Sequence, residues 1–333
     1  MTVRTREIHL AARPTAEPGP EHFALVETDL PEPAPGQVLV RNTWMSVDPY
    51  MRGRMNDAPS YIPPFEIGRP LEGSAVGEVV ASRAEGVPVG STVSHFLGWR
   101  EHSLLDAAGV TVLDATRIPA SAYLGPLGTT GLTAHLALTD TAPVRPGDTV
   151  YVSAAAGAVG SVAARIARDL GAARIVGSAG GPDKTRLLLE EFGYDAAFDR
   201  RGGDLAARLA EAAPDGVDVY LDSVGGDHLE AALSVMNQGG RVALIGAVGD
   251  YNDAEPAPGP NLYRAATREV TLRGMLVSNH LHRFPEFHAK AVPWLLDGTL
   301  RTRETVLDGL EKAPEALRGV LEGANTGKML VRL

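Results

Sequence analysis

The sequence has no cysteine among its 333 residues. Disulfide bonds, cysteine-ligated zinc and thiol nucleophiles are therefore excluded. No apolar run approaches the ~20 residues that a membrane-spanning helix needs. The N-terminal segment (MTVRTREIHLAARP) has no apolar stretch long enough for a signal peptide. We therefore expect a cytoplasmic protein that does not contact a membrane.

Basic residues are also scarce, with 31 Lys and Arg against 41 Asp and Glu and a formal net charge of -10. This balance argues against nucleic acid as a partner, although a local basic pocket for one phosphate is compatible with it. Hydrophobic residues make up 44% and charged residues 22% of the chain, which excludes a disordered protein. Because domains usually span ~100–200 residues, we expect two of them.

The first third of the chain is rich in predicted strands. Short apolar segments such as residues 37–41 (QVLVR) and 77–81 (GEVVA) are separated by turns such as residues 31–36 (PEPAPG). Turns at this close spacing favour a compact, partly open β-barrel over a helical bundle.

From about residue 125 the pattern changes to short β-branched runs that alternate with helical stretches rich in alanine and leucine. This alternation predicts βαβ units and a parallel sheet covered on both faces, hence an α/β, doubly wound Rossmann fold. Residues 250–260 are a turn-rich loop too polar for a core. The expected strands are 149–153, 174–177, 217–221, 241–245 and 305–307, and the expected helices are 160–170, 184–192 and 313–321.

Residues 150–160 (VYVSAAAGAVG) have the spacing of a dinucleotide-binding turn, with Ala155 where the first glycine normally stands. Gly157 lets the backbone approach a pyrophosphate, and Gly160 allows close packing of helix and strand. The helix that follows directs its amide groups and its positive dipole end at the phosphates. A preceding strand, a following helix and a second βαβ unit make dinucleotide binding the preferred interpretation over an ordinary turn.

The second strand of this region is followed by Ser178 and residues 179–181 (AGG), without a carboxylate. An NAD enzyme normally has Asp or Glu there, which accepts a hydrogen bond from the ribose 2′-hydroxyl. Lys184 and Arg200 lie nearby in the sequence, and such cations suit a 2′-phosphate. The alternative is that both are solvated surface charges. We predict NADP(H) as the cofactor.

Several longer motifs resemble one family, the zinc-independent medium-chain dehydrogenase/reductases. Within it, the chain is similar to the leukotriene hydroxydehydrogenase, prostaglandin reductase and curcumin reductase group, which are NADPH-dependent alkenal/one double-bond reductases. The motifs cover nearly the whole chain in order. They are residues 45–55 (MSVDPYMRGRM), 127–135 (LGTTGLTAH), 154–161 (AAAGAVGS), 222–226 (DSVGG), 246–252 (GAVGDYN) and 323–328 (GANTGK).

The resemblance implies a β-rich GroES-like catalytic domain over residues 1–124 and 296–333, a Rossmann NADP-binding domain over residues 125–295, and a homodimer. It implies hydride transfer from NADPH to the β-carbon of an α,β-unsaturated aldehyde or ketone. Such a reaction needs the hydride close to an electron-poor carbon and a donor at the oxygen where enolate charge develops. No strong base is required.

The resemblance also implies site residues. Tyr50, and alternatively Tyr263, would act at the substrate, and Tyr50 could equally be a core tyrosine. Ser178 is added from the strand-end argument above. The expected cofactor contacts are Gly157, Ala158, Val159, Gly160, Ser178, Lys184, Arg200, Ser223, Ile245, Gly246, Ala247, Tyr251, Met275, Leu276, Val277 and Asn325.

Some positions depart from the pattern of the family. Arg200 stands where relatives commonly have a tyrosine near the 2′-phosphate, and Ser223 replaces an asparagine. Thr129-Thr130 replaces Met-Pro, and His135 replaces a tyrosine. The substrate-side tyrosine of several relatives corresponds to Thr267, with Tyr263 one helical turn earlier. The carbonyl donor is then either Tyr263, or Tyr50 together with the ribose hydroxyl.

The sequence also bears on other classes of protein. A zinc alcohol dehydrogenase needs Cys and His ligands and a Gly-His-Glu motif, whereas residues 67–73 (IGRPLEG) contain no histidine. Histidines at the spacing of His280, His282 and His288 are more often surface or core residues than metal ligands. We therefore predict no metal site. The absence of a Gly-x-Ser-x-Gly elbow argues against a hydrolase. Quinone reduction and a non-catalytic NADPH-binding sensor or structural protein stay open as alternatives.

Overall fold

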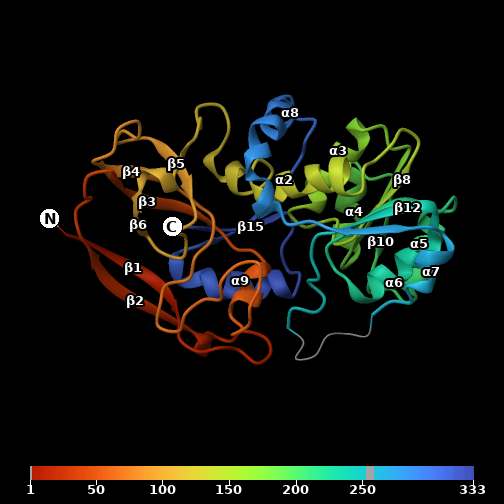
Figure 1. Ribbon diagram of the computed structural model, residues 1–333, viewed down its shortest axis with the longest axis horizontal. Helices are drawn as coiled ribbons and strands as arrows, with labels where there is room; N and C mark the ends of the chain where they lie inside the picture. The colour runs from red at the N-terminus through yellow and green to blue at the C-terminus, as the bar shows by residue number, and fades with distance from the viewer. Residues whose placement is uncertain (1, 253–258) are drawn as a thin grey trace. The chain divides into compact units, whose positions relative to one another are not determined.

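The computed structural model describes residues 2–252 and 259–333 (Figure 1). Residues 253–258 of the predicted 250–260 loop therefore lie outside the described residues. The chain forms two compact units, one of Met1–Leu124 with Glu304–Leu333 and one of Gly125–Arg303. The functional division at residues 124 and 296 stays a prediction.

Within the described residues, the second unit contains a six-stranded sheet in the order β10-β9-β8-β11-β12-β13. All its strand pairs are parallel. Its central strands, β8 and β11, are mostly apolar and almost entirely buried, as expected for a parallel sheet. This confirms the predicted α/β fold. The strands are β8 (Thr149–Val152), β9 (Arg174–Ala179), β10 (Ala196–Asp199), β11 (Val217–Asp222), β12 (Met236–Leu244) and β13 (Thr271–Gly274).

Helices cover both faces of this sheet, and Figure 1 shows α5, α6 and α7 grouped on one side of it and α2 and α3 on the other. Helix α4 begins at Pro182, two residues before the predicted start, because proline is favoured in a first turn. Asp204 caps α5 by accepting from the amides of Ala206 and Ala207. The helices are α2 (Thr129–Leu136), η4 (Ala137–Thr141), α3 (Gly160–Asp169), α4 (Pro182–Glu190), α5 (Leu205–Ala212), α6 (Gly226–Val235), α7 (Tyr263–Thr267), η5 (Val277–Arg283) and α8 (Phe284–Leu296).

The first unit is rich in strands, as predicted. A seven-stranded sheet has the order β14-β15-β3-β4-β5-β7, with β6 also paired to β3, and β1 and β2 form a separate antiparallel pair. The strands are β1 (Val3–Leu10), β2 (Phe23–Leu30), β3 (Gln37–Ser46), β4 (Ala75–Ser82), β5 (Thr92–His95), β6 (His102–Asp106), β7 (Thr111–Val112), β14 (Glu304–Asp308) and β15 (Lys328–Arg332).

The C-terminal segment completes the core of this first unit. Leu317 and Met329 pack with Met51, Met55 and other apolar side chains from the N-terminal segment. None of the helices in the described part of the chain is long and apolar enough to cross a bilayer. The helices of this unit are η1 (Pro20–His22), α1 (Tyr50–Arg54), η2 (Ala107–Gly109), η3 (Ala120–Leu124), η6 (Leu310–Lys312) and α9 (Ala313–Leu321).

Candidate functional site

Most of the residues predicted to contact the cofactor follow the carboxyl ends of the six parallel strands. Strand β8 comes first in the chain but lies between β9 and β11, so the strand order reverses beside it. In open parallel sheets, ligands bind at the carboxyl edge near such a reversal. The structure brings to this edge the turn after β8, Lys184, Arg200 and the loops after β11, β12 and β13.

The turn after β8 is tight and is closed by its own backbone. Ala154 has a φ of 48°, the amide of Gly157 donates to the carbonyl of Ala154 at 2.8 Å, and α3 starts at Gly160. A Cβ on Gly160 would lie 2.4 Å from the carbonyl oxygen of Ala155. Only glycine fits there. The backbone therefore approaches closely where a pyrophosphate would meet the N-terminus of the helix.

Ala155, which replaces the usual first glycine, is accommodated by a glycine on the neighbouring strand. A Cβ on Gly177 of β9 would lie 2.9 Å from the Cβ of Ala155 and 2.8 Å from Cδ1 of Tyr194. The amide of Ala155 also donates to the carbonyl of Ser178 at 2.9 Å. Sequence reasoning missed the role of Gly177, although a glycine inside a strand is a signal of close approach.

Three cations gather where β9 and β10 end. Burial lowers the pKa of Lys184, and the positive charges of Arg201 and Arg200 lower it further. The Arg201 guanidinium covers Gly180, where a Cβ would lie 3.2 Å from its Nε. Among the described residues, neither Arg200 nor Arg201 forms an ion pair with a carboxylate. This local positive field fits a phosphate. Arg201 is not among the residues that the sequence predicted to contact the cofactor.

Asp199 ties the loops after β9 and β10 together. Its Oδ1 accepts from the amides of Gly181 and Arg201, each at 2.9 Å. These two hydrogen bonds lower the pKa of the carboxyl group. Asp199 therefore fixes the backbone on which the cations are mounted.

Ser178 lies in the interior and not beside the three cations. It is fully buried, and its Oγ is 2.9 Å from the Tyr151 hydroxyl, which is 2.9 Å from Nδ1 of His228. Burial lowers the pKa of His228 to about 4, and the charge of Arg200 acts in the same direction. In this arrangement Ser178 supports the turn after β8 through its carbonyl, and the expected contact of its hydroxyl with a phosphate stays a prediction.

The loops after β11 and β12 interlock. Oδ1 of the buried Asp222 accepts from the amides of Val224 and Gly225, both at 2.9 Å. Ser223 donates through its amide to Oγ of Ser153 at 3.0 Å and accepts from the amide of Val248 at 3.0 Å. The residues after β11 and those after β12 therefore form one continuous surface.

The remaining predicted cofactor residues of this unit continue that surface. The amide of Ala247 donates to the Tyr251 hydroxyl at 3.5 Å, and burial raises the pKa of Tyr251. The amide of Ile245 donates to the carbonyl of Asp222 at 2.9 Å, and that of Met275 to the carbonyl of Leu244 at 3.1 Å. A Cβ on Gly246 would lie 3.3 Å from the carbonyl oxygen of Ser223. Leu276 and Val277 follow directly, and Leu276 is partly exposed.

Tyr50 and Asn325 lie in the first unit. Tyr50 opens α1, and its hydroxyl oxygen is buried without a hydrogen-bond partner among the described residues. Burial, and then the charge of Asp48, raise the pKa of Tyr50, while Arg54 opposes the rise. Asn325 donates through Nδ2 to the carbonyl of Gly327 at 2.7 Å.

Tyr263 is not brought together with the carboxyl-edge loops by any contact among the described residues. It lies on α7 with 73% of its surface exposed. That helix packs on α6, where Arg264 and Glu230 approach to 3.4 Å. Thr267, at the other end of α7, donates to the carbonyl of Arg264 at 3.1 Å.

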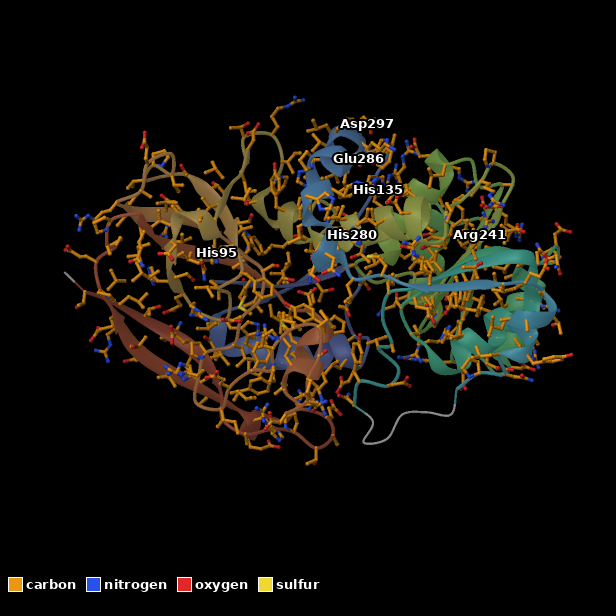
Figure 2. The ribbon with its side chains drawn as sticks, in the orientation of Figure 1. His95, His135, Arg241, His280, Glu286 and Asp297 are labelled. Carbon is orange, nitrogen blue, oxygen red and sulfur yellow. The ribbon has the colours of Figure 1, made fainter. Side chains whose placement is uncertain are left out.

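The histidines form no metal cluster in the described part of the chain, where no three His, Asp or Glu side chains are placed to hold an ion. The rings of His280 and His282 are 6.2 Å apart, and Nε2 of His288 lies 2.7 Å from the carbonyl of Leu127. His135, the departure on α2, lies with Nε2 3.4 Å from Oε1 of Glu286 on α8 (Figure 2). Burial lowers its pKa.

Two family models match the chain. Residues 6–113 match the N-terminal domain of oxidoreductase and residues 158–295 match zinc-binding dehydrogenase. The chain lacks the cysteine ligands of such enzymes, and the described residues offer no alternative ligand set, so they do not fit a zinc ion.

Curated relatives cover nearly the whole chain. It is 37% identical to the NADPH-dependent curcumin reductase of Escherichia coli (strain K12), over 99% of this chain and 97% of the relative. It is also 37% identical to the 2-alkenal reductase (NADP(+)-dependent) of Nicotiana tabacum, over 88% and 86% of the two chains.

Solved structures agree. CurA from Vibrio vulnificus, solved in complex with NADPH, has a TM-score of 0.93 and 36% identity over 98% of both chains. A quinone oxidoreductase of Escherichia coli, with a TM-score of 0.79 and 22% identity over 99% of this chain and 100% of the other, shares the fold. The predicted cofactor is confirmed as NADP(H), and the carboxyl-edge turn and the three cations fit it. The chain belongs to the medium-chain dehydrogenase/reductases, within the NADP-dependent oxidoreductases that include the curcumin, alkenal and prostaglandin reductases.

Proposed function

We propose that this protein reduces the carbon–carbon double bond of α,β-unsaturated aldehydes and ketones, with hydride delivered to the β-carbon. The observation that carries the proposal is the similarity, over at least 88% of the chain, to relatives named curcumin reductase and 2-alkenal reductase. Both names denote an enzyme that acts on a conjugated carbonyl compound. Bound NADPH supplies the hydride.

The second unit supplies the cofactor contacts. The amides of Ala158, Val159 and Gly160, at the start of α3, bind the pyrophosphate, and Gly157, whose own amide donates to Ala154, lets the backbone approach it closely. Lys184, Arg200 and Arg201 bind the 2′-phosphate by charge-assisted hydrogen bonds. Ser223, the loop at residues 245–251, residues 275–277 and Asn325 line the remainder of the cofactor.

Tyr50 is the substrate donor in this proposal. Its buried hydroxyl has no partner in the described part of the chain, so it is free to donate to the carbonyl oxygen where negative charge develops. Because its pKa is raised, the hydroxyl keeps its proton and acts as a donor and not as a base. The α-carbon takes its proton from solvent. Tyr263, whose side chain is mostly exposed, is kept as the alternative donor.

Quinone reduction is the second candidate, supported by the shared fold of the quinone oxidoreductase. A non-catalytic NADPH-binding role is the third. We also propose that the chain forms a homodimer and that residues 1–124 with 296–333 make up the catalytic domain. The experiment below is designed to separate the three functions.

The test is to incubate the purified protein with NADPH and, separately, an alkenal, an enone, a quinone and a saturated ketone, and to follow oxidation of the cofactor. With NADPH deuterated at the transferred position, mass spectrometry and NMR of the product should find deuterium on the β-carbon. Turnover of the quinone alone would replace the proposal with the second candidate. Tight NADPH binding without any turnover would support the third.

Variants assign the donor. Tyr50→Phe should lower kcat by about 100-fold, the typical cost of removing one donor from a developing oxyanion. Tyr263→Phe is the comparison, and a loss confined to that variant would transfer the role to Tyr263. Tyr123→Phe, which removes a hydrogen bond to the carbonyl of Asp114 in the same unit, is the control.

A further inference from the structure

A buried ion pair connects the N-terminal and C-terminal segments of the first unit. Nζ of Lys328 lies 2.9 Å from Oδ1 of Asp48 and 3.0 Å from the carbonyl oxygen of Val47. The other carboxylate oxygen of Asp48 accepts from the hydroxyl of Ser46. Lys328 is 3% exposed and Asp48 is 8% exposed. Both charges are thus removed from water and neutralise each other.

Stability alone does not account for this pair. Withdrawing two charges from water costs several kcal/mol per ion, and apolar replacements of buried pairs are often neutral or stabilising. The surroundings would suit an apolar pair, because Met45, Met51 and Val331 are fully buried in the same core. An ion pair in such a place serves better to fix one arrangement of the chain than to raise the free energy of unfolding.

Each charge stands next to a segment that carries one of the proposed site residues. Asp48 lies two positions before Tyr50, the first residue of α1. The backbone carbonyl of Asp48 accepts from the amide of Met51 in the first turn of that helix, at 3.1 Å. Lys328 begins β15 directly after residues 325–327, the turn that carries Asn325.

The turn at residues 325–327 is held on its other side as well. Gly327 has a φ of 66°, and the amide of Thr326 donates to Oγ1 of Thr305 at 3.0 Å. The turn is therefore fixed to β14 at one point and, through Lys328, to the start of α1 at another. Lys328 also contacts the carbonyl of Val47, and β15 pairs with β3 from Leu330 onward, so the ion pair is one of several contacts that connect the start of α1 to this turn.

We propose that Asp48 and Lys328 are positioning residues that hold the Tyr50 segment and the Asn325 turn in fixed register. The catalytic meaning of this register rests on the proposed function, in which Tyr50 meets the substrate and Asn325 meets the cofactor. Misplacing such groups by about 1 Å lowers rates by about two orders of magnitude. The ion pair touches neither substrate nor cofactor and acts through these two segments.

The test compares the double variant Asp48→Asn/Lys328→Met with wild type. It removes both charges together, so no unpaired charge is left in the core, and its thermal midpoint should stay near that of wild type. The matched control is Asp308→Asn/Arg332→Met, which removes an exposed pair between β14 and β15 of the same unit.

Two readouts are needed. The kcat for enone reduction should fall at least tenfold while the Kd for NADPH stays within twofold, a split that a loss of folded protein would not produce. Hydrogen exchange, measured by mass spectrometry, should become at least tenfold faster both at residues 49–52 and at residues 325–327, with β11 unchanged. The control pair should change neither quantity.

Wild-type kcat together with wild-type exchange in the double variant would overturn the proposal. Faster exchange at only one of the two segments would overturn it too. If wild type reduces no enone, the proposed function fails, yet exchange at both segments still decides whether the pair links them. Should the double variant not fold, Lys328→Met alone, which removes the same contact, replaces it and is judged by exchange at the same two segments.

Discussion

The proposed phosphate end of the site, in the second unit, and its proposed substrate end, in the first unit, are built in different ways. At the phosphate end, the backbone sets the geometry: Gly160 fits closely against Ala155, and Asp199 bonds to two amides. At the substrate end, single side chains do so, namely the buried Tyr50 and the ion pair between Asp48 and Lys328. The first kind of site is encoded within a few consecutive residues. The second depends on residues 280 positions apart.

The largest effect is expected from Gly160→Ala. Its new Cβ would meet the carbonyl of Ala155 at 2.4 Å, so the turn must shift away from its binding geometry. Overpacking of this severity costs about 3 kcal/mol, which corresponds to a roughly 100-fold weaker Kd for NADPH. Titration of NADPH fluorescence measures this. Gly109→Ala, where a Cβ meets nothing within 4 Å, is the control. An unchanged Kd for Gly160→Ala would show that the backbone does not set the phosphate end.

Lys184→Ala should lower the preference for NADPH over NADH by about 30-fold, because a charge-assisted hydrogen bond contributes about 2 kcal/mol. Arg201→Ala should act in the same direction, and both losses should shrink at high salt. Arg186→Ala, on the same helix but paired with Asp183, is the control. The ratio of the Kd for NADH to the Kd for NADPH, compared between variant and wild type, measures this preference. If it stays at the wild-type value, these cations are only surface charges.

His228 makes the free energy of unfolding depend on pH. Its pKa is lowered from 6.5 to about 4 in the folded protein, so below pH 6.5 the unfolded chain binds a proton that the native one does not. Stability contributed by the neutral histidine is therefore present above pH 6.5 and is lost as the pH falls toward 4. At pH 5 the loss is about 2 kcal/mol. Urea unfolding of wild type and His228→Asn at pH 7 and pH 5 measures it, and an equal pH dependence in both proteins would contradict the prediction.

The smallest effect concerns Gly177, the glycine on β9 that makes room for Ala155. Gly177→Ala should weaken NADPH binding about tenfold, because its Cβ would lie 2.9 Å from that of Ala155. Adding Ala155→Gly should restore part of the loss, since it removes that one contact and leaves those with Tyr194 and Leu188. Binding in the double variant no better than in Gly177→Ala would show that the two positions are not coupled.

The sequence predicted the parallel sheet, the turn after β8 and the cofactor because these depend on local patterns of apolar residues and glycine. It did not predict where Ser178 points. Residues two apart on a strand share a face, and Ser178 shares one with Val176, which packs with Tyr151 in the core. The exposure of Tyr263 was not predictable either, because α7 has only five residues and shows no period. The pairing of Asp48 with Lys328 required the fold.

The hydrogen bonds of Asp199 have a consequence for how cofactor preference can change. Lys184 lies in the first turn of α4, after β9, and Arg200 and Arg201 lie on the loop after β10, whereas the proposed pyrophosphate turn belongs to β8 and α3. In the proposed site, recognition of the 2′-phosphate is therefore separate from recognition of the pyrophosphate. We expect substitutions at positions 184, 200 and 201 to turn the protein toward NADH without disturbing the turn. A descendant of this chain could acquire a new electron donor through one partly buried position, 184, and two exposed positions, 200 and 201, while its sheet stays as it is.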